Sequence, residues 1–559
     1  MGDTVDVWGR AAVGVVELGG VGGAGGAAQH GGCTGGVACR RASVDVFWCA
    51  TRTSASGCNL PSLENHSHAS NLDKGDRPMH PDDREALAEK RICCNCVREG
   101  FLSHLVSHDG TVALCDYCGD DEAKTRPIGD LADWIETAFE DHFVRTPTEP
   151  DPWEYALYAD RELGRAWYRE GQETAEAIEE AAQIPTDAAH DVQVLLEDRH
   201  DDVEAGQMGD ETEFASDAHY AGKGADAAEW HREWWSFENA LKTEARYFSR
   251  AAAELLTRVF ENIDTLRAKQ RRRPPVVNVG PNRKLINLYR ARVFQSEDKL
   301  KEALCRPDLH IGPPPTRLAS AGRMNARGIS VFYGATNASV ALAEVRPPVG
   351  SKVALAKFSI IRSLRLLDLT ALDNLRDGGS IFDPTLKGRL ERVAFLQSLG
   401  ERMTRPVMPD DEAFEYLTTQ AIADFLATEN KPRLDGIIFH SAQSKGGRNV
   451  VLFHKAAQVE EMTFPHGTEI EAYTGYGTED GMETDYGVSE AVPNEAPSLT
   501  NEVVADLTRH FMHPGPAYCV DSDFRAATLR VDPSSVEVHH VDWVKINTIR
   551  FTVSRRRHE

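Results

Sequence analysis

The chain has 559 residues, of which 41% are hydrophobic, and its formal net charge is −25 at pH 7. This length exceeds one compact core, so two or three domains are expected. The acidic excess argues against a protein that wraps nucleic acid, because neutralising phosphates requires a basic surface. The sequence has no long apolar run of the kind that spans a bilayer and no compact apolar block of a secretory signal, so we expect a cytoplasmic protein without a membrane span.

The first 78 residues are rich in glycine and carry little patterned apolar sequence. Such a stretch buries too little apolar surface to offset the entropy of ordering, so residues 1–78 are predicted to be a disordered extension. Met79 opens the first organised segment, and the extension is therefore also consistent with an upstream choice of start site.

Two cysteine pairs, each with two residues between its members, follow closely in the chain: Cys93 and Cys96, then Cys115 and Cys118. Zn²⁺ prefers four thiolate or imidazole ligands in a tetrahedron, and each CxxC turn supplies two sulfurs. This spacing predicts a closed structural zinc site in a zinc ribbon over residues 88–125, which holds a small hairpin against a helical region.

The ligand set has alternatives. Cys94 is left over, and His104 or His108 can replace one sulfur. Free or redox-active cysteines are the other interpretation of the cluster.

Arg98 and His104 have the spacing of a ribonuclease Arg-His motif, but both lie between the two cysteine pairs, and we interpret that spacing as chance.

Helical periodicity dominates the next stretch. Apolar residues recur at helical spacing over 128–143 and again over 247–266, with an acidic, alanine-rich segment between them. Together with the cysteine pairs, these helices predict an α-helical amino-terminal domain over 88–267. A basic stretch with a proline pair predicts an exposed linker over 268–284; a nucleic-acid patch is the less favoured interpretation of its arginines.

Short β-rich runs then alternate with helical stretches, which indicates an α+β domain over 285–456. Residues 457–525 are acidic and rich in Gly, Thr and Glu, so an inserted loop is expected there. Alternating residues in the last segment, 526–559, predict one or two terminal strands.

The second half resembles the RES family, which is named for Arg, Glu and Ser. The resemblance is carried, in family order, by Leu288–Arg292, Gly322–Asn325, Gly328–Ala335, Ala341–Val345, Tyr416–Gln420, Asp435–Ser441 and Gly447–Phe453. It implies a fold similar to ADP-ribosyltransferases, NAD as substrate, and a toxin that travels with a protein antitoxin or regulator. The zinc ribbon and helices resemble the HEPN-like amino-terminal domain attached to some RES domains.

The same resemblance implies the site residues: catalytic Arg290, Tyr333, Glu344 and Ser441, with Arg323 and Asn449 binding the dinucleotide. These residue types suit the chemistry. Guanidinium groups bind phosphate oxygens bidentately, and a carboxylate stabilises an oxocarbenium-like ribose. A tyrosine ring offers a flat face to nicotinamide.

Each of these residues also has a structural interpretation. Arg290 can form a surface ion pair, Tyr333 can belong to the core, Glu344 can lie on a helix surface, and Ser441 and Asn449 can cap turns. His440 adjoins Ser441, but strand alternation turns it away. No GxSxG elbow surrounds Ser441, which disfavours a Ser-His-Asp hydrolase.

The functional prediction is an NAD glycohydrolase or phosphorylase that cleaves the nicotinamide–ribose bond, in a toxin or defence setting. The alternatives are an ADP-ribosyltransferase that modifies a macromolecule and a non-catalytic NAD-binding or interaction protein. The sequence leaves the acceptor (water, phosphate or a macromolecule) and the oligomeric state open.

Overall fold

The computed structural model describes residues 80–158, 167–202, 210–268, 274–478, 481–493 and 525–557. The predicted disordered extension, linker residues 269–273 and residues 494–524 of the predicted acidic loop lie outside this part of the chain. Two compact units are present. We call them the cysteine unit, which holds the described residues up to Asp226 together with Gly378–Glu391, and the sheet unit, which holds those of Ala227–Asp377 and Arg392–Glu559.

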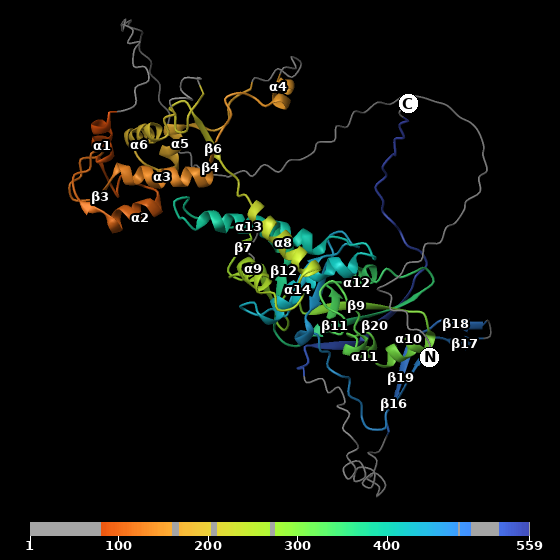
Figure 1. Ribbon diagram of the computed structural model, residues 1–559. Helices are drawn as coiled ribbons and strands as arrows, with labels where there is room; N and C mark the ends of the chain where they lie inside the picture. The colour runs from red at the N-terminus through yellow and green to blue at the C-terminus, as the bar shows by residue number, and fades with distance from the viewer. Residues whose placement is uncertain are drawn as a thin grey trace, which may run out of the picture. The chain divides into compact units, whose positions relative to one another are not determined.

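The cysteine unit is mainly helical (Figure 1). Its helices are α1 (Pro81–Ala88), α2 (Gly100–Asp109), α3 (Ile128–His142), α4 (Pro152–Tyr158), α5 (Thr174–Ala182) and α6 (Thr186–Arg199). Strands β1 (Arg91–Cys93), β3 (Lys124–Pro127) and β2 (Thr111–Val112) form one small sheet in that order, and β4 (Phe143–Arg145), β6 (His219–Gly222) and β5 (Gln172–Glu173) form another.

The predicted helix at 128–143 is confirmed as α3. Its apolar stripe, which includes Leu131, Ile135 and Phe139, is buried in the core of the cysteine unit. The turn of chain before α2 is fixed by Glu99, whose carboxylate accepts a hydrogen bond from Leu102 N at 2.8 Å and so caps the helix.

The sheet unit is built on one eight-stranded sheet with the order β20-β11-β9-β10-β15-β14-β12-β8, which confirms the α+β prediction for this half of the chain (Figure 1). The strands are β8 (Val276–Val279), β9 (Asn287–Phe294), β10 (Phe332–Ala335), β11 (Lys352–Ile360), β12 (Leu364–Asp368), β14 (Gly436–His440), β15 (Arg448–Leu452) and β20 (Leu529–His540). All pairs are antiparallel except β12 with β14.

Helices and smaller elements surround this sheet. The helices are α8 (Ala228–Thr243), α9 (Arg250–Phe260), α10 (Glu297–Cys305), α11 (Pro307–His310), α12 (Ala338–Glu344), α13 (Leu386–Thr404) and α14 (Glu412–Thr428), with 3₁₀ turns η1 (Thr316–Leu318), η2 (Leu369–Asn374) and η3 (His454–Ala456). The division between the two units falls within α13, after Glu391. A short pair, β7 (Arg267–Ala268) and β13 (Leu375–Arg376), completes this part.

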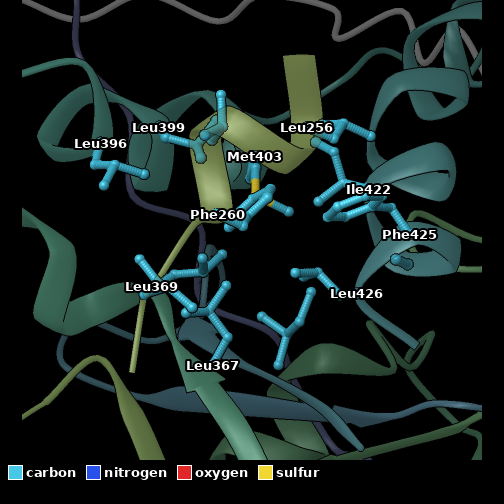
Figure 2. Close-up of a cluster of buried hydrophobic side chains, with 14 of the residues drawn as sticks. Leu256, Phe260, Leu367, Leu369, Leu396, Leu399, Met403, Ile422, Phe425 and Leu426 are labelled. Carbon is cyan, nitrogen blue, oxygen red and sulfur yellow. The ribbon is translucent and has the colours of Figure 1, made fainter. Parts of the chain in front are cut away.

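Helices α8 and α9 belong to the sheet unit, whereas the sequence grouped them with the amino-terminal helices up to residue 267. The reason is their apolar stripe. Trp234 on α8 and Phe260 on α9 join one core cluster with Leu399 of α13 and Ile422 of α14. Figure 2 shows Leu256, Phe260, Ile422 and Phe425 directed toward one another in this cluster.

Part of the predicted acidic loop at 457–525 is ordered into two hairpins: β16 (Glu469–Tyr473) pairs with β19 (Gly487–Ala491), and β17 (Tyr476–Thr478) pairs with β18 (Gly481–Glu483). A loop alone was the wrong expectation for these residues, since Ala472 is buried in a core cluster with Leu300 of α10. One terminal strand, β20, is confirmed, but residues 541–557 form no strand and expose Trp543 and Phe551.

Truncating the centre of the Figure 2 cluster tests this packing. Phe260 is 0% exposed, and we expect Phe260→Ala to lower the free energy of unfolding of the sheet unit by about 3–5 kcal/mol, because a cavity remains where the ring was. Urea denaturation followed by tryptophan fluorescence measures the loss. Phe248→Ala is the matched control, since that ring is fully exposed, and an equal loss in both variants would contradict the packing.

Candidate functional site

Glu344 is the last residue of α12, a short helix that packs on the sheet. The helix begins at Asn337, whose Oδ1 caps it by accepting a hydrogen bond from Val340 N at 2.9 Å. Val340 and Ala341 bury its inner face. The helix cannot continue past Arg346 because two prolines follow, so the chain places the Glu344 carboxylate at a helix end.

Ser441 and Asn449 meet Glu344 from the neighbouring hairpin. Strands β14 and β15 are antiparallel with Phe439 opposite Asn449, so Ser441, just past the end of β14, lies near Asn449. Ser441 Oγ donates to Glu344 Oε1 at 2.5 Å, and Asn449 Nδ2 donates to the same oxygen at 2.8 Å. Among the described residues no hydrogen bond reaches Glu344 Oε2, so this oxygen is free for a substrate.

The loop after Ser441 fixes its hydroxyl. Ser441 Oγ accepts hydrogen bonds from Gln443 N at 3.1 Å and Ser444 N at 3.0 Å while it donates to Glu344. The loop also approaches α12 closely, because a Cβ on Gly447 would stand 2.6 Å from Val340 Cγ2. Ser441 therefore both caps this turn and contacts the Glu344 carboxylate.

Asn449 is 7% exposed, and its Oδ1 is buried without a hydrogen-bond partner in the part of the chain that the structure describes. An unsatisfied buried carbonyl oxygen costs about 1–3 kcal/mol. A ligand that donates a hydrogen bond to this oxygen would remove that cost. The amide therefore holds Glu344 with one end and offers an acceptor with the other.

Arg290 and Tyr333 form a second group. Arg290 Nη1 donates to the Tyr333 carbonyl at 2.8 Å, and its guanidinium lies 5.3 Å from the Phe332 ring centroid. Burial, and then the charge of Arg292, lower the pKa of Arg290 to about 10, so the group stays charged at neutral pH. Its Nε is buried and without a partner among the described residues, and no hydrogen bond joins Arg290 to the Glu344 group there.

The Tyr333 hydroxyl is held by Met324 and Asn325, two residues to which the sequence analysis assigned no role. It donates to Asn325 Oδ1 at 2.8 Å and accepts from Met324 N at 3.0 Å. Burial raises the pKa of Tyr333, so the hydroxyl keeps its proton. Asn325 is 3% exposed and also donates to three backbone carbonyls. The only sequence signal that Asn325 would hold the Tyr333 hydroxyl was its place as a polar residue in the run Gly322–Asn325.

Arg323 lies against Tyr416 of α14. Its guanidinium carbon is 5.0 Å from the Tyr416 ring centroid, and its two terminal nitrogens donate to the carbonyls of Met403 at 3.2 Å and Arg405 at 2.9 Å. These contacts connect the loop before β10 to the end of α13. Much of the hydrogen-bonding capacity of Arg323 is therefore directed at the protein itself.

His440 takes no part in the Glu344 group. Within the described residues it lines a separate cavity of about 370 Å³ with Asp373, Glu401 and Thr404. This position agrees with the strand-alternation argument that turned its ring away from Ser441.

The cysteine unit brings the four predicted sulfur ligands together. The Sγ atoms of Cys93, Cys96, Cys115 and Cys118 all lie within 4.8 Å of one another, with 3.5 Å between Cys93 and Cys118 and 3.9 Å between Cys96 and Cys115. Tetrahedral zinc with Zn–S bonds of about 2.3 Å requires sulfurs about 3.8 Å apart. The cluster is therefore compatible with one zinc ion in a zinc ribbon.

The alternative ligands lie elsewhere. The rings of His104 and His108 stack on α2 with centroids 5.8 Å apart, and His108 Nδ1 pairs with Asp109 Oδ1 at 2.6 Å. Cys94 Sγ contacts Asn95 instead of the cluster. In the described parts of the chain, the group with metal-ligand geometry is the four-sulfur set.

Comparison with known protein families matches residues 288–472 to the RES domain. This range contains all six predicted site residues and extends beyond the predicted domain end at 456 into β16. No curated protein and no solved structure matches the chain. The HEPN-like character of the first half and the similarity to ADP-ribosyltransferases stay predictions. None of the described helices is both long enough and apolar enough to cross a membrane.

Proposed function

This chain carries a RES domain, and from that premise we propose that it cleaves the nicotinamide–ribose bond of NAD, as a glycohydrolase or a phosphorylase. RES domains are associated with NAD-processing, toxin-like proteins at the level of the family. The observation that carries the proposal is the Glu344 carboxylate, held at Oε1 by Ser441 and Asn449 with Oε2 left open.

The chemistry needs few groups. The C1′–N bond breaks with its electron pair returning to the pyridine nitrogen, so nicotinamide leaves as a neutral molecule without a general acid. The ribose becomes oxocarbenium-like, and a carboxylate beside it stabilises the positive charge. An oxygen of water or of inorganic phosphate then bonds to C1′, and the water, where it is the acceptor, passes one proton to solvent.

The neighbouring residues position these groups. Ser441 and Asn449 fix the orientation of the Glu344 carboxylate before substrate arrives, which reduces the reorganisation needed in the transition state. Asn449 Oδ1 accepts a hydrogen bond from a ribose hydroxyl or from the carboxamide. Arg290 donates to the Tyr333 carbonyl, and its charge would attract the phosphates of the dinucleotide.

For the first half of the chain, the proposal is structural. Cys93, Cys96, Cys115 and Cys118 would hold one Zn²⁺ ion, with no ligand position left for catalysis. A regulatory or antitoxin partner and a toxin or defence role are proposed from the family resemblance.

Incubation of the purified full chain with NAD, with and without inorganic phosphate, tests the function. Release of nicotinamide without label on protein supports a glycohydrolase, and dependence on phosphate supports a phosphorylase. If the amount of nicotinamide released equals the amount of ADP-ribose attached to an added macromolecule, the result would support a transferase instead. If the protein binds NAD saturably but leaves it intact, the domain would be an NAD-binding module without this activity.

A further inference from the structure

Arg346 follows Glu344 by two residues and has an unusual backbone. Its φ is +42°, in the left-handed region that side chains other than glycine seldom occupy, and it directly precedes Pro347, which further restricts it. Residues held in such conformations cluster at functional sites. The side chain is exposed, so burial of an apolar group does not explain the conformation.

A short chain of contacts connects Arg346 to the Glu344 carboxylate. In the amide orientation that satisfies both groups, Gln443 Oε1 accepts from Arg346 Nη2 at 2.7 Å and from Nε at 3.1 Å. Gln443 N donates to Ser441 Oγ, which donates to Glu344. The Arg346 guanidinium therefore lies beside the site, in contact with the loop that carries Ser441.

The partner of Arg346 is neutral. Among the described residues Arg346 forms no ion pair, although the chain as a whole carries an excess of carboxylates. A fork of two N–H groups that faces a neutral amide matches the geometry by which guanidinium groups bind phosphate oxygens. A phosphate would replace the Gln443 amide and bring the missing negative charge.

Arg323 and Arg290 have fewer N–H groups left to bind a phosphate. Arg323 donates to the carbonyls of Met403 and Arg405, and Arg290 donates to that of Tyr333. Burial and the hydrogen bond to Glu412 raise the pKa of Tyr416, and the charges of Arg323 and Arg346 both oppose this rise. Both guanidinium groups are therefore within electrostatic reach of the same ring, as is the Glu412 carboxylate that accepts a hydrogen bond from the Tyr416 hydroxyl.

We infer that Arg346, with the loop from Ser441 to Gly447, forms a phosphate subsite beside Glu344. Its ligand is a phosphate group, supplied either by the pyrophosphate of the dinucleotide or by inorganic phosphate that accepts the ribosyl group. The inference rests on the proposed function and adds a binding residue outside the six that the sequence indicated.

Steady-state kinetics with three substrates test the subsite: NAD, nicotinamide mononucleotide with one phosphate, and nicotinamide riboside with none. We expect Arg346→Ala to raise the KM for NAD roughly 10- to 100-fold, the range for one lost charge-assisted hydrogen-bond pair, and to change kcat by less than about threefold. The riboside without added phosphate should react equally with both proteins. Arg346→Lys should recover part of the loss, because lysine keeps the charge without the fork.

A phosphate titration separates the two sources. If inorganic phosphate is the ligand, Arg346→Ala raises the KM for phosphate and leaves the KM for NAD unchanged. Arg365→Ala, which removes an exposed arginine of β12, is the matched control and should behave as wild type.

The failures of the two proposals differ. Unchanged KM values for NAD and phosphate in Arg346→Ala, with an active wild type, would overturn the subsite and leave NAD cleavage standing. If the wild type releases no nicotinamide, the proposed function fails, and titration calorimetry with ADP-ribose decides the subsite alone. At least 10-fold weaker binding by Arg346→Ala supports it, and equal or absent binding by both proteins overturns it.

Discussion

Glu344→Gln is expected to lower kcat/KM for NAD by roughly 10³-fold or more, the scale on which removal of a preorganised charge-stabilising group acts. Glutamine keeps the shape and one acceptor oxygen for Ser441 and Asn449. It replaces the open Oε2 with a neutral NH₂ group, so the positive charge that develops on the ribose finds no negative partner. The measurement is the initial rate of nicotinamide release under conditions where the fold is checked by circular dichroism.

The surrounding residues give a graded series. Ser441→Ala and Asn449→Ala each remove one of the two donors to Oε1, so we expect smaller losses, roughly 10-fold each, that combine non-additively because both act on one carboxylate. Glu429→Gln, at the exposed end of α14, is the charge-matched control and should retain full activity. Wild-type turnover by Glu344→Gln would remove the carboxylate from the mechanism.

Local sequence was sufficient where one element carries the chemistry. The apolar run around Val340 to Glu344 predicts a helical stretch, and the structure has α12 there. The register of one hairpin brings Ser441 close to Asn449. Their contacts with Glu344 join segments 97 and 105 positions apart, and the sequence indicated these three residues through the family resemblance.

Contacts between distant loops were not predictable in the same way. Asn325 holds the Tyr333 hydroxyl through a loop geometry that no periodicity encodes. The contact between Arg346 and Gln443 depends on a left-handed residue and on a turn 97 positions away. The stripe on α9 predicted a helix, but not that its partners would be α13 and α14, because any apolar surface of suitable shape satisfies such a stripe.

Cys93→Ser should have a large effect on the other unit. Cys93 is 0% exposed at the end of β1, so the substitution removes one buried sulfur, while the backbone N–H that donates to Cys115 Sγ at 3.3 Å remains. Structural zinc contributes about 10–16 kcal/mol of apparent binding energy in small zinc-finger peptides. The cysteine unit also has a hydrophobic core, which includes Ile92 and Leu102 and does not depend on the metal.

We therefore expect Cys93→Ser to lose the roughly one zinc ion per chain found in the wild type and to lower the Tm of the cysteine unit by at least about 10 °C, without complete unfolding. Metal analysis and differential scanning calorimetry measure the two effects, and a chelator should reproduce them in the wild type. Cys94→Ser is the matched control, because this neighbouring thiol lies outside the four-sulfur group. Full zinc content and an unchanged Tm in Cys93→Ser would mean that the cluster is a set of free thiols. Equal zinc loss in Cys94→Ser would instead mean that the ligand set differs from the four sulfurs.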